Sequence, residues 1–303
     1  TEGACASGGL AVYEAINSLL AGKFENVLVV GAEKMTDRTS ENVAMALMAA
    51  GSDAERQAGA TFPALYALLA RAHMDKYGTT EEEMASVAVK NHYHASLNGI
   101  AQFPFPVSAE EVLNSAKIAD PLKLLDCSPI TDGAAAIVLT SNKKQVTRNK
   151  TPEIVASEVA TDTLGLAQRE SLTELKATVM AGKNAYLRAE IGPEDVDVAE
   201  LHDCFTIAEI LAVEDLGFFK KGEAGKRILM GETKLGSKGL ITNTSGGLKA
   251  CGHPVGATGV KQIVEITKQL NGHAGKKQVA GAKVGLCQNV GGSGATAVVT
   301  ILK

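Results

Sequence analysis

Four cysteine- or histidine-bearing loops in this chain have the residue types that acyl transfer through a thioester requires. Cys5 lies in the glycine-rich stretch EGACASGG, directly before the apolar run LAVYEAINSLL. A thiol at this place lies at the positive end of a predicted helix, where the helix dipole favours the thiolate. A free cysteine in a tight turn is more often a small buried residue, so a nucleophile at Cys5 requires partners elsewhere in the chain.

Three later segments offer these partners. LHDCF carries His202 and Cys204 two residues apart, and side chains two apart on extended backbone project from the same face. CGHPVGATG places His253 in a Gly/Pro-rich turn before a predicted helix, and GLCQNVGGSG supplies glycine amides that can approach a ligand closely. Each residue alone is more often structural, but all of these loops fall at junctions between helices and strands, where α/β folds place their sites.

The combination predicts acyl transfer to a cysteine. A cysteine nucleophile needs an imidazole that accepts its proton, and His253 is the candidate. The carbonyl oxygen of a thioester becomes negative in the tetrahedral state and needs two aimed donors. The amide of Cys5 and one amide from the loop that contains Gly291 and Gly292 could supply them.

A second substrate that is a carbon acid would require a second base, together with donors for its enolate. Cys204 as the base, with His202 and His253 as the donors, would complete that set. Cys127 and Cys251 are expected to be core thiols, as most free cysteines are. The five scattered cysteines match neither a disulfide framework nor a zinc site. The sequence therefore predicts no metal and no cofactor.

Composition narrows the class of ligand. The chain has 303 residues with 45% hydrophobic side chains, which is enough for a large core and two domains. A net charge of −4, no tryptophan and no basic tract argue against nucleic acid and a membrane surface as partners. No apolar span long enough for a bilayer and no signal peptide is found, so we expect a cytoplasmic protein with small-molecule substrates.

Local patterns predict alternating helices and strands. The first helix follows Ser7 as its cap and ends at Gly22, and the buried strand NVLVVGAEKM is closed by Gly31. Residues 36–126 contain helical patches with little strand signal, which indicates an inserted, mostly helical loop domain. The strand pattern resumes at DGAAAIVLTS.

The charged stretch KKQVTRNKTPE is the best boundary, and it divides the chain into 1–150 and 151–303. Beyond it, EIVASEVATDT and DVDVAELHDCF predict strands, and TIAEILAVEDLG predicts a helix that ends at Gly217. A glycine-rich loop followed by a helix and a strand is predicted to begin at GACASGG and again at ACGHPVGATG. The segment SPITDGAAAIVLTS is similar to the later segment NVGGSGATAVVTILK. Such repeats favour two similar α/β halves with a site between them. The first half begins without the strand and helix that should precede its loop.

The motifs EGACASGG, HDCF, CGHPVGATG and QNVGGSG, in this order, resemble the thiolase family, specifically its SCP2-like and archaeal acetoacetyl-CoA thiolase branch. The resemblance covers essentially the whole chain. It implies two βαβαβαββ halves in α/β/α/β/α layers with a loop domain at about 36–126. It also implies an acyl-enzyme on Cys5, coenzyme A esters as substrates, and matching roles for His202, Cys204 and His253.

Two departures from the family pattern matter. Many thiolases place the acid/base cysteine in a C-x-G loop, whereas Cys287 is followed here by Gln288 and Asn289. Cys204 is therefore preferred over Cys287 for the acid/base role. Family members also carry a strand-helix stretch before the nucleophile, so the first sheet of this chain is expected to be incomplete.

The expected function is that of an acetyl-CoA C-acetyltransferase, which makes acetoacetyl-CoA from two acetyl-CoA in the mevalonate pathway and catalyses the reverse thiolysis. A degradative 3-ketoacyl-CoA thiolase for longer chains would differ only in pocket size. A non-catalytic thiolase-like scaffold would be expected to lose a catalytic residue, and all four are present. The resemblance further implies a homo-tetramer built from dimers and a possible complex with HMG-CoA synthase through an OB-fold bridging protein.

Overall fold

The computed structural model describes residues 1–142 and 151–303, so residues 143–150 of the expected domain boundary lie outside the described residues. The chain begins with the short turn η1 (Ala4–Ala6), the helix α1 (Ser7–Leu20) and the strand β1 (Asn26–Glu33). Gly22 follows the helix with a positive φ of 68°, as predicted for its end. The prediction for Ser7 is wrong, because Ala6 is the N-cap and the Ser7 hydroxyl donates to the Ala4 carbonyl.

Gly31 does not close β1, which continues two residues further to Glu33. A Cβ at Gly31 would lie 2.8 Å from the Cα of Ala257. The glycine therefore serves a close backbone approach rather than the end of the strand.

A mostly helical segment lies between β1 and β4 (Gly133–Thr140). Its helices α2 to α6 each begin after a Ser or Thr whose side chain accepts a backbone N–H of the first turn, the usual N-cap. The elements are α2 (Ser40–Leu47), η2 (Met48–Ala50), α3 (Asp53–Gln57), α4 (Phe62–Tyr77), α5 (Glu81–Ser96), α6 (Ala109–Asn114), β2 (Lys117–Ala119), β3 (Leu122–Lys123) and η3 (Leu124–Asp126).

The second half supplies a five-stranded sheet in the order β5-β9-β8-β6-β7. Its elements are β5 (Ile154–Thr161), η4 (Leu166–Gln168), α8 (Lys176–Ala189), η5 (Pro193–Asp195), β6 (Val198–Glu200), α9 (Thr206–Asp215), α10 (Ala224–Leu229), β7 (Ile241–Thr242), α11 (Gly247–Cys251), α12 (Thr258–Leu270), η6 (Gly275–Lys277), β8 (Gly285–Gly291) and β9 (Thr296–Leu302). Strands β6, β7 and β8 run parallel, and β9 is antiparallel to both β8 and β5.

In the first half, the described residues form one antiparallel strand pair, β1–β4, at the position that matches the five-stranded sheet of the second half. The other two described strands of this half, β2 and β3, form a separate small ribbon. The pair β1–β4 corresponds to β8–β9 of the second half, because in both halves a loop and helix lead into the first strand of the pair. Counterparts of β5, β6 and β7 are absent from the described residues of the first half. The prediction of an incomplete first sheet is therefore confirmed.

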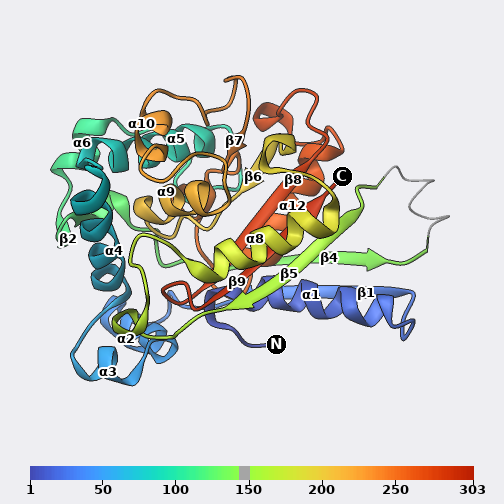
Figure 1. Cartoon of the computed structure of the whole chain (residues 1–303), viewed down its shortest axis with the longest axis horizontal. Coiled ribbons are helices and arrows are strands. Elements are labelled where there is room, and N and C mark those ends of the chain that lie inside the picture. Colours follow the sequence, from blue (N-terminus) through green and yellow to red (C-terminus); the bar gives the residue numbers. More distant parts are fainter. Residues whose placement is uncertain (143–150) are drawn as a thin grey trace.

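The helices α1 and α12 pack against each other between the two sheets, and α8 covers the other face of the five-stranded sheet (Figure 1). The two central helices meet closely, since a Cβ at Gly259 would lie 2.1 Å from the Gly9 nitrogen. On the outer face of β1–β4, Leu28, Val30 and Val138 are 65%, 57% and 61% exposed. The described residues thus form four of the five expected layers.

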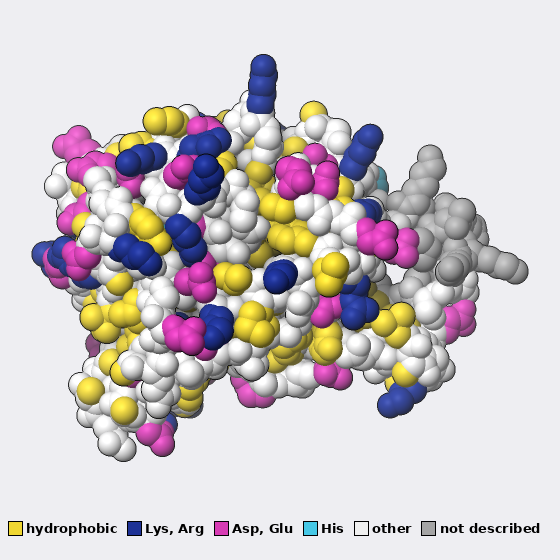
Figure 2. Space-filling view, viewed as in Figure 1, with side chains coloured by type: hydrophobic (Ala, Val, Ile, Leu, Met, Phe, Trp, Pro, Cys, Tyr) yellow, Lys and Arg dark blue, Asp and Glu magenta, His cyan; other side chains and the backbone are white. Residues whose placement is uncertain are grey.

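Charged side chains of both signs are interspersed on the face shown in Figure 2. None of the helices in the described residues is long and apolar enough to span a bilayer.

Candidate active site

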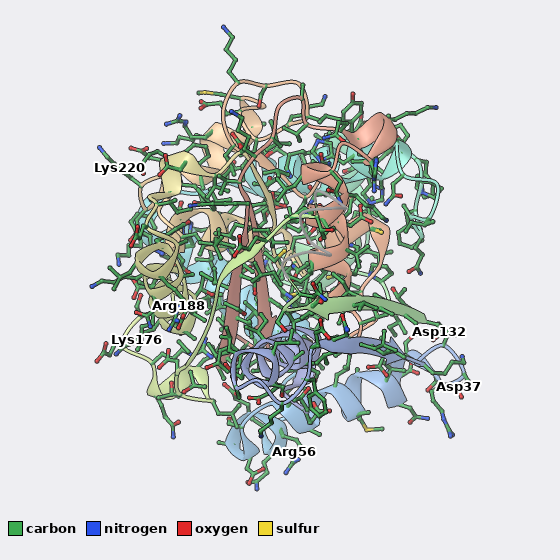
Figure 3. The ribbon with its side chains drawn as sticks, turned by 90° about the vertical axis from the view of Figure 1, so that its right-hand side faces the viewer. Asp37, Arg56, Asp132, Lys176, Arg188 and Lys220 are labelled. Carbon is green, nitrogen blue, oxygen red and sulfur yellow. The ribbon has the colours of Figure 1, made fainter. Side chains whose placement is uncertain are left out.

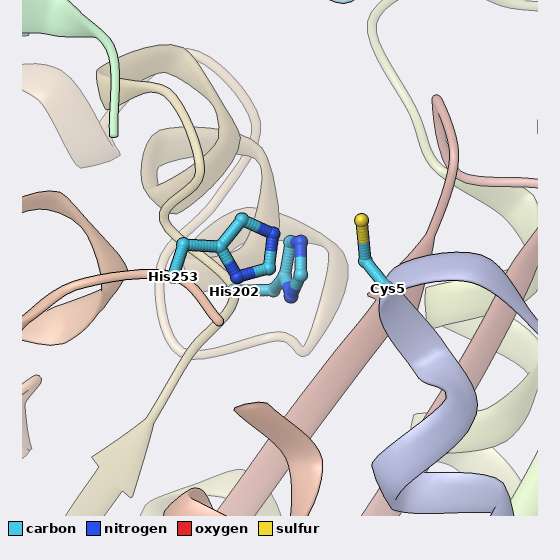
Figure 4. A group of neighbouring side chains, drawn as sticks. All are labelled: Cys5, His202 and His253. Carbon is cyan, nitrogen blue, oxygen red and sulfur yellow. The ribbon is translucent and has the colours of Figure 1, made fainter. Parts of the chain in front are cut away.

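Three of the predicted residues meet at one point. Cys5 Sγ and ring nitrogens of His202 and His253 all lie within 4.8 Å of one another. Cys5 is in the turn before α1, His202 is in the loop after β6, and His253 is in the loop between α11 and α12. The sulfur faces the two rings, which stand edge to face with centroids 5.1 Å apart (Figure 4). The fold therefore joins the first-half loop to two second-half loops, as the repeats imply.

Cys204 lies on the same cavity, which it lines together with Cys5, His253 and Cys127. Cys287 does not line this cavity. It lies in β8 and packs in the core beneath α1 and α12. The structure therefore places Cys204, and not Cys287, where a second cysteine could act on a substrate bound at Cys5.

The cavity has a volume of about 190 Å³ and is mostly apolar. Its walls come from the segment after β1, from α2 and α4, and from the loops before β4 and α12. The apolar side chains include Met35, Val43, Leu47, Phe62, Ile130 and Val255. Such a lining suits an acyl group and excludes water from the reacting atoms.

Asp132 fixes one wall of this cavity from outside. Its carboxylate accepts the N–H groups of Met35 and Thr36 at 2.7 and 2.9 Å and pairs with Lys34 at 2.7 Å. These contacts hold the pKa of Asp132 well below its usual range. Figure 3 shows Asp132 on the same edge of the molecule as Asp37.

Backbone amides surround the Cys5 sulfur. The N–H groups of Gly292 and of Cys5 itself favour the thiolate and lower the pKa of the Cys5 thiol. Gly291 packs directly on the turn before α1, since a Cβ there would lie 2.5 Å from the Gly3 carbonyl oxygen. Of the two glycines singled out in the sequence, Gly292 therefore presents its amide to the sulfur, while Gly291 allows the loop to approach.

The electrostatics of the site contradict the expected thiolate. Burial raises the pKa of Cys5 from 9.0 to about 12, which outweighs the amides of Gly292 and Cys5. Burial likewise lowers the pKa of His253 to about 3 and that of His202 well below its usual range. At neutral pH the resting site therefore holds a neutral thiol and two neutral imidazoles.

Asn289 fixes the proton of His202. Its Oδ1 accepts the Gly9 N–H at 3.0 Å and its Nδ2 donates to the Cys5 carbonyl at 2.9 Å, so the orientation of the amide group is determined. The same Nδ2 faces His202 Nδ1 at 3.4 Å, and that nitrogen must accept. Nε2 then carries the hydrogen, and it is buried with no partner among the described residues. A buried donor of this kind is satisfied when a ligand brings an acceptor.

His253 meets a different kind of partner. Its Nδ1 lies 2.7 Å from the Thr258 hydroxyl, which also has the Pro254 carbonyl within 3.1 Å. A hydroxyl can accept from Nδ1 while it donates to Pro254, or it can turn and donate to Nδ1. His253 can therefore present either a lone pair or an N–H at Nε2, whereas His202 presents only an N–H.

A buried carboxylate holds the two histidine loops together. Asp203, next to His202, accepts the N–H groups of Leu248 and Lys249 at 2.6 and 3.2 Å and the Asn91 amide at 2.7 Å. Burial raises the pKa of Asp203 to about 7. Because Leu248 and Lys249 belong to α11, which leads into the His253 loop, Asp203 couples the positions of both imidazoles.

Sequence reasoning missed Asn289 and Asp203 as site residues. Both stand inside motifs that the sequence did single out, QNVGGSG and HDCF. Their polar side chains at otherwise buried positions were the available signal, because a buried amide or carboxylate must find hydrogen-bond partners.

Comparison with known proteins gives a consistent result over the whole chain. Residues 2–143 match the family described as "Thiolase, N-terminal domain", and residues 158–303 match "Thiolase C-terminal domain-like". The acetyl-CoA acetyltransferase of Methanothermobacter thermautotrophicus is 50% identical over 301 residues, which cover 99% of this chain and 78% of that protein. Sterol carrier protein 2 of Homo sapiens is 38% identical over 317 residues, which cover 99% of this chain and 57% of that protein.

A solved structure described as "Ltp2-ChsH2(DUF35) aldolase" superposes with a TM-score of 0.81 at 26% identity. The match covers 98% of this chain and 78% of that one.

Proposed function

Because the chain belongs to the thiolase family, we propose that it joins two acetyl-CoA molecules to form acetoacetyl-CoA and catalyses the reverse thiolysis. The observation that carries this proposal is the meeting of Cys5, His202 and His253 at one point, beside a cavity that Cys5, His253 and Cys204 line. The name of the archaeal relative at 50% identity supports the choice of acetyl-CoA as the substrate.

In the first step, Cys5 Sγ attacks the thioester carbonyl of acetyl-CoA while His253 Nε2 takes the thiol proton. A carbon–sulfur bond to Cys5 forms and the bond to CoA breaks, and CoA leaves as a thiol with the proton returned by His253. The amides of Cys5 and Gly292 stabilise the oxygen that becomes negative. The lone pair that His253 can present supports its role as the base.

In the second step, Cys204 first loses its thiol proton to water, and the thiolate so formed removes a proton from the methyl group of another acetyl-CoA. The electron pair of the C–H bond passes into the enolate oxygen, which accepts from Nε2–H of His202 and of His253. The enolate carbon then attacks the acetyl carbonyl on Cys5, the carbon–sulfur bond to Cys5 breaks, and the released sulfur takes up the proton that Cys204 has gained. The Thr258 hydroxyl can either accept from His253 Nδ1 or donate to it, and this supports a role for His253 in both steps.

We further propose that neither a metal nor a cofactor takes part. Cys5, His202 and His253 lie close enough together to be considered as ligands. Ligation through His202 Nε2, however, would move its proton to Nδ1, opposite the donor Nδ2 of Asn289. Incubation with EDTA should leave the rate unchanged, and a loss that a divalent ion restores would contradict this point.

A degradative thiolase for longer 3-ketoacyl chains is the alternative. The apolar cavity wall and the similarity to sterol carrier protein 2 favour it. The deciding measurement compares kcat/KM for thiolysis of acetoacetyl-CoA and of a long-chain 3-ketoacyl-CoA by the full-length protein. A preference for acetoacetyl-CoA supports the proposal, and the reverse preference supports the alternative.

A non-catalytic scaffold would give a third outcome, in which neither substrate turns over and Cys5 remains unmodified. Cys5→Ala should abolish thiolysis, whereas Cys127→Ala, a change in the wall of the same cavity, should retain it. Equal losses in the two variants would indicate damage to the cavity rather than removal of a nucleophile.

Assembly remains a prediction of the resemblance, and location remains a prediction from the sequence. We propose a homo-tetramer built from dimers, located in the cytoplasm, with HMG-CoA synthase and an OB-fold bridging protein as partners. Light scattering of the full-length protein tests the tetramer, and a monodisperse monomer would contradict it.

A further inference from the structure

Tyr66 lies on α4 and extends into the cavity, and it has no role in the two steps of the proposed reaction. Its side chain is 1% exposed and lines the cavity beside Cys5 and Cys204. The ring stacks on Phe205, with centroids 4.6 Å apart and 30° between the planes. Since Phe205 directly follows Cys204, this stacking locates the phenol against the acid/base cysteine.

The phenol hydroxyl has two neighbours that matter for the reaction. It donates to the Gly292 carbonyl at 3.1 Å, and this contact is buried. It also lies on the same cavity as the Cys204 thiol and lowers the pKa of that thiol, although burial raises this pKa well above its usual value. Gly292 is the residue whose own N–H faces Cys5, so one hydroxyl touches both halves of the catalytic machinery.

We propose that Tyr66 is a positioning residue that holds the Gly292 loop in place and donates a hydrogen bond from its hydroxyl to the Cys204 thiolate during the carbon–carbon step. This inference rests on the proposed function, because it assigns a partner to the base of that reaction. Tyr66 touches no reacting carbon atom and acts through Cys204 and Gly292.

The single hydroxyl hydrogen serves two acceptors in turn. With Cys204 as a thiol, the S–H can donate to the phenol oxygen while the phenol donates to Gly292. With Cys204 as a thiolate, the phenol hydrogen turns to the sulfur. No proton leaves Tyr66, whose pKa burial raises well above its usual value. The C–H bond of the methyl group breaks, the S–H bond of Cys204 forms, and the electron pair goes to the enolate oxygen.

Other groups also act on this pair. Asp203 precedes Cys204 and, like Cys5, opposes a negative charge on its sulfur. Arg169 approaches from the segment after η4, lowers the pKa of Tyr66, and donates to the Ser293 carbonyl at 2.7 Å. Asp203, Cys5 and Arg169 are unchanged in a Tyr66→Phe variant, so a change in its pH profile reports on the hydroxyl.

The test compares Tyr66→Phe with Tyr186→Phe in the full-length protein. Tyr186 is partly buried and donates to the Leu216 carbonyl at 3.0 Å, but it lies on α8, away from the cavity. The readout is hydrogen–deuterium exchange at the methyl group of acetyl-CoA as a function of pH, measured beside single-turnover acylation of Cys5.

In Tyr66→Phe, we expect methyl exchange to fall about tenfold to a hundredfold, the scale of a lost hydrogen bond to a charged group. The rise of exchange with pH should move to higher pH by about one pH unit or more, because the thiolate has lost a donor. Acylation should fall less, and Tyr186→Phe should match the wild type. An unmoved pH profile in Tyr66→Phe would overturn the inference, whereas a wild type without exchange would count against the proposed function itself.

A second variant keeps the test decisive if Tyr66→Phe does not fold. 3-Fluorotyrosine at position 66 retains the ring and its hydrogen bonds and makes the phenol a stronger donor. The rise of methyl exchange should then move to lower pH. A profile that coincides with that of the wild type would contradict the role assigned to Tyr66.

Discussion

Replacement of His202 by alanine tests whether His202 and His253 have different roles in the two steps. His202 Nε2 is a buried N–H without a partner among the described residues, and Asn289 prevents the ring from offering a lone pair there. It can therefore stabilise an enolate oxygen but cannot accept the proton of Cys5. His202→Ala should impair enolate formation much more than acylation.

The expected size of the effect follows from the number of donors. The enolate oxygen has two in our mechanism, His202 and His253, and the variant leaves one. Loss of a single oxyanion donor costs about 100-fold to 1000-fold in rate, or about 3 to 4 kcal/mol. His253→Ala should impair both steps, because the same ring also takes the Cys5 proton.

The assay measures methyl exchange of acetyl-CoA in D₂O beside single-turnover acylation of Cys5 in the same preparation. His92→Ala is the matched control, because His92 Nε2 is likewise buried and unpartnered in the described chain. His92 lies on α5, does not line the cavity, and has a pKa that burial lowers to about 4. This variant should change neither rate by more than a few-fold.

One result would refute this reasoning. If His202→Ala abolishes acylation while methyl exchange persists, the two oxyanion sites have been assigned the wrong way round. His202→Gln gives a further check, since its amide can return an N–H near the position of Nε2. Partial recovery of exchange is then expected, without any change in acylation.

Three more outcomes follow from the same geometry. Acetyl-CoA should place an acetyl group on the Cys5 peptide in peptide mass spectrometry, and acetyl found only on the Cys204 or Cys287 peptide would reverse the assignment. Cys204→Ala should keep Cys5 acylation but slow condensation by about a hundredfold or more, while Cys287→Ala changes little; the opposite ranking would restore the C-x-G interpretation. Burial lowers the pKa of His94 from 6.5 to about 3, so the unfolded chain binds the extra proton and the free energy of unfolding should fall as pH drops below 6.5. Urea titrations of His94→Gln should show a weaker pH dependence, and an unchanged slope would contradict the neutral, buried His94.

Local sequence signals were sufficient for most elements of the fold. The apolar spacing after Cys5 and the glycine at position 22 predicted α1, whose last residue is Leu20. The β-branched run before Gly31 predicted β1. The repeat of loop, helix and strand predicted two similar halves, because each repeated unit buries its apolar face only by packing on the other.

Features of the fold that depend on contacts between distant segments could not be predicted from local sequence. The N-terminal end of α1 looked like a Ser7 cap, but the chain enters the helix through a separate turn that packs on Gly291. Gly31 looked like the end of a strand because its approach to Ala257 is invisible in the sequence. In each case a partner more than 200 residues away in the chain changed what the local pattern meant.

The dependence on contacts between distant segments also explains which site residues could be predicted from the sequence and which could not. Thiols and imidazoles in glycine-rich turns are conspicuous by their chemistry alone. Asn289 and Tyr66, in contrast, acquire their importance from contacts with Cys5 and Gly292, which are 284 and 226 positions away, respectively. Only the folded chain shows that these polar groups decide which atoms of the catalytic residues carry hydrogen.

Cys5 is a neutral thiol in the structure and not the thiolate that the helix dipole led us to expect, and this changes how acylation must begin. A helix dipole contributes about 0.3 to 1 kcal/mol to an ion near its end. The rise of the Cys5 pKa from 9.0 to about 12 corresponds to about 4 kcal/mol against ionisation, so burial outweighs the dipole. The resting pair of Cys5 and His253 is therefore neutral, and charge separates only when the thioester carbon accepts the electron pair of the sulfur. Acylation then depends on a base that acts during the attack and on amides aimed at the new oxyanion, which are the features that the cavity brings to Cys5.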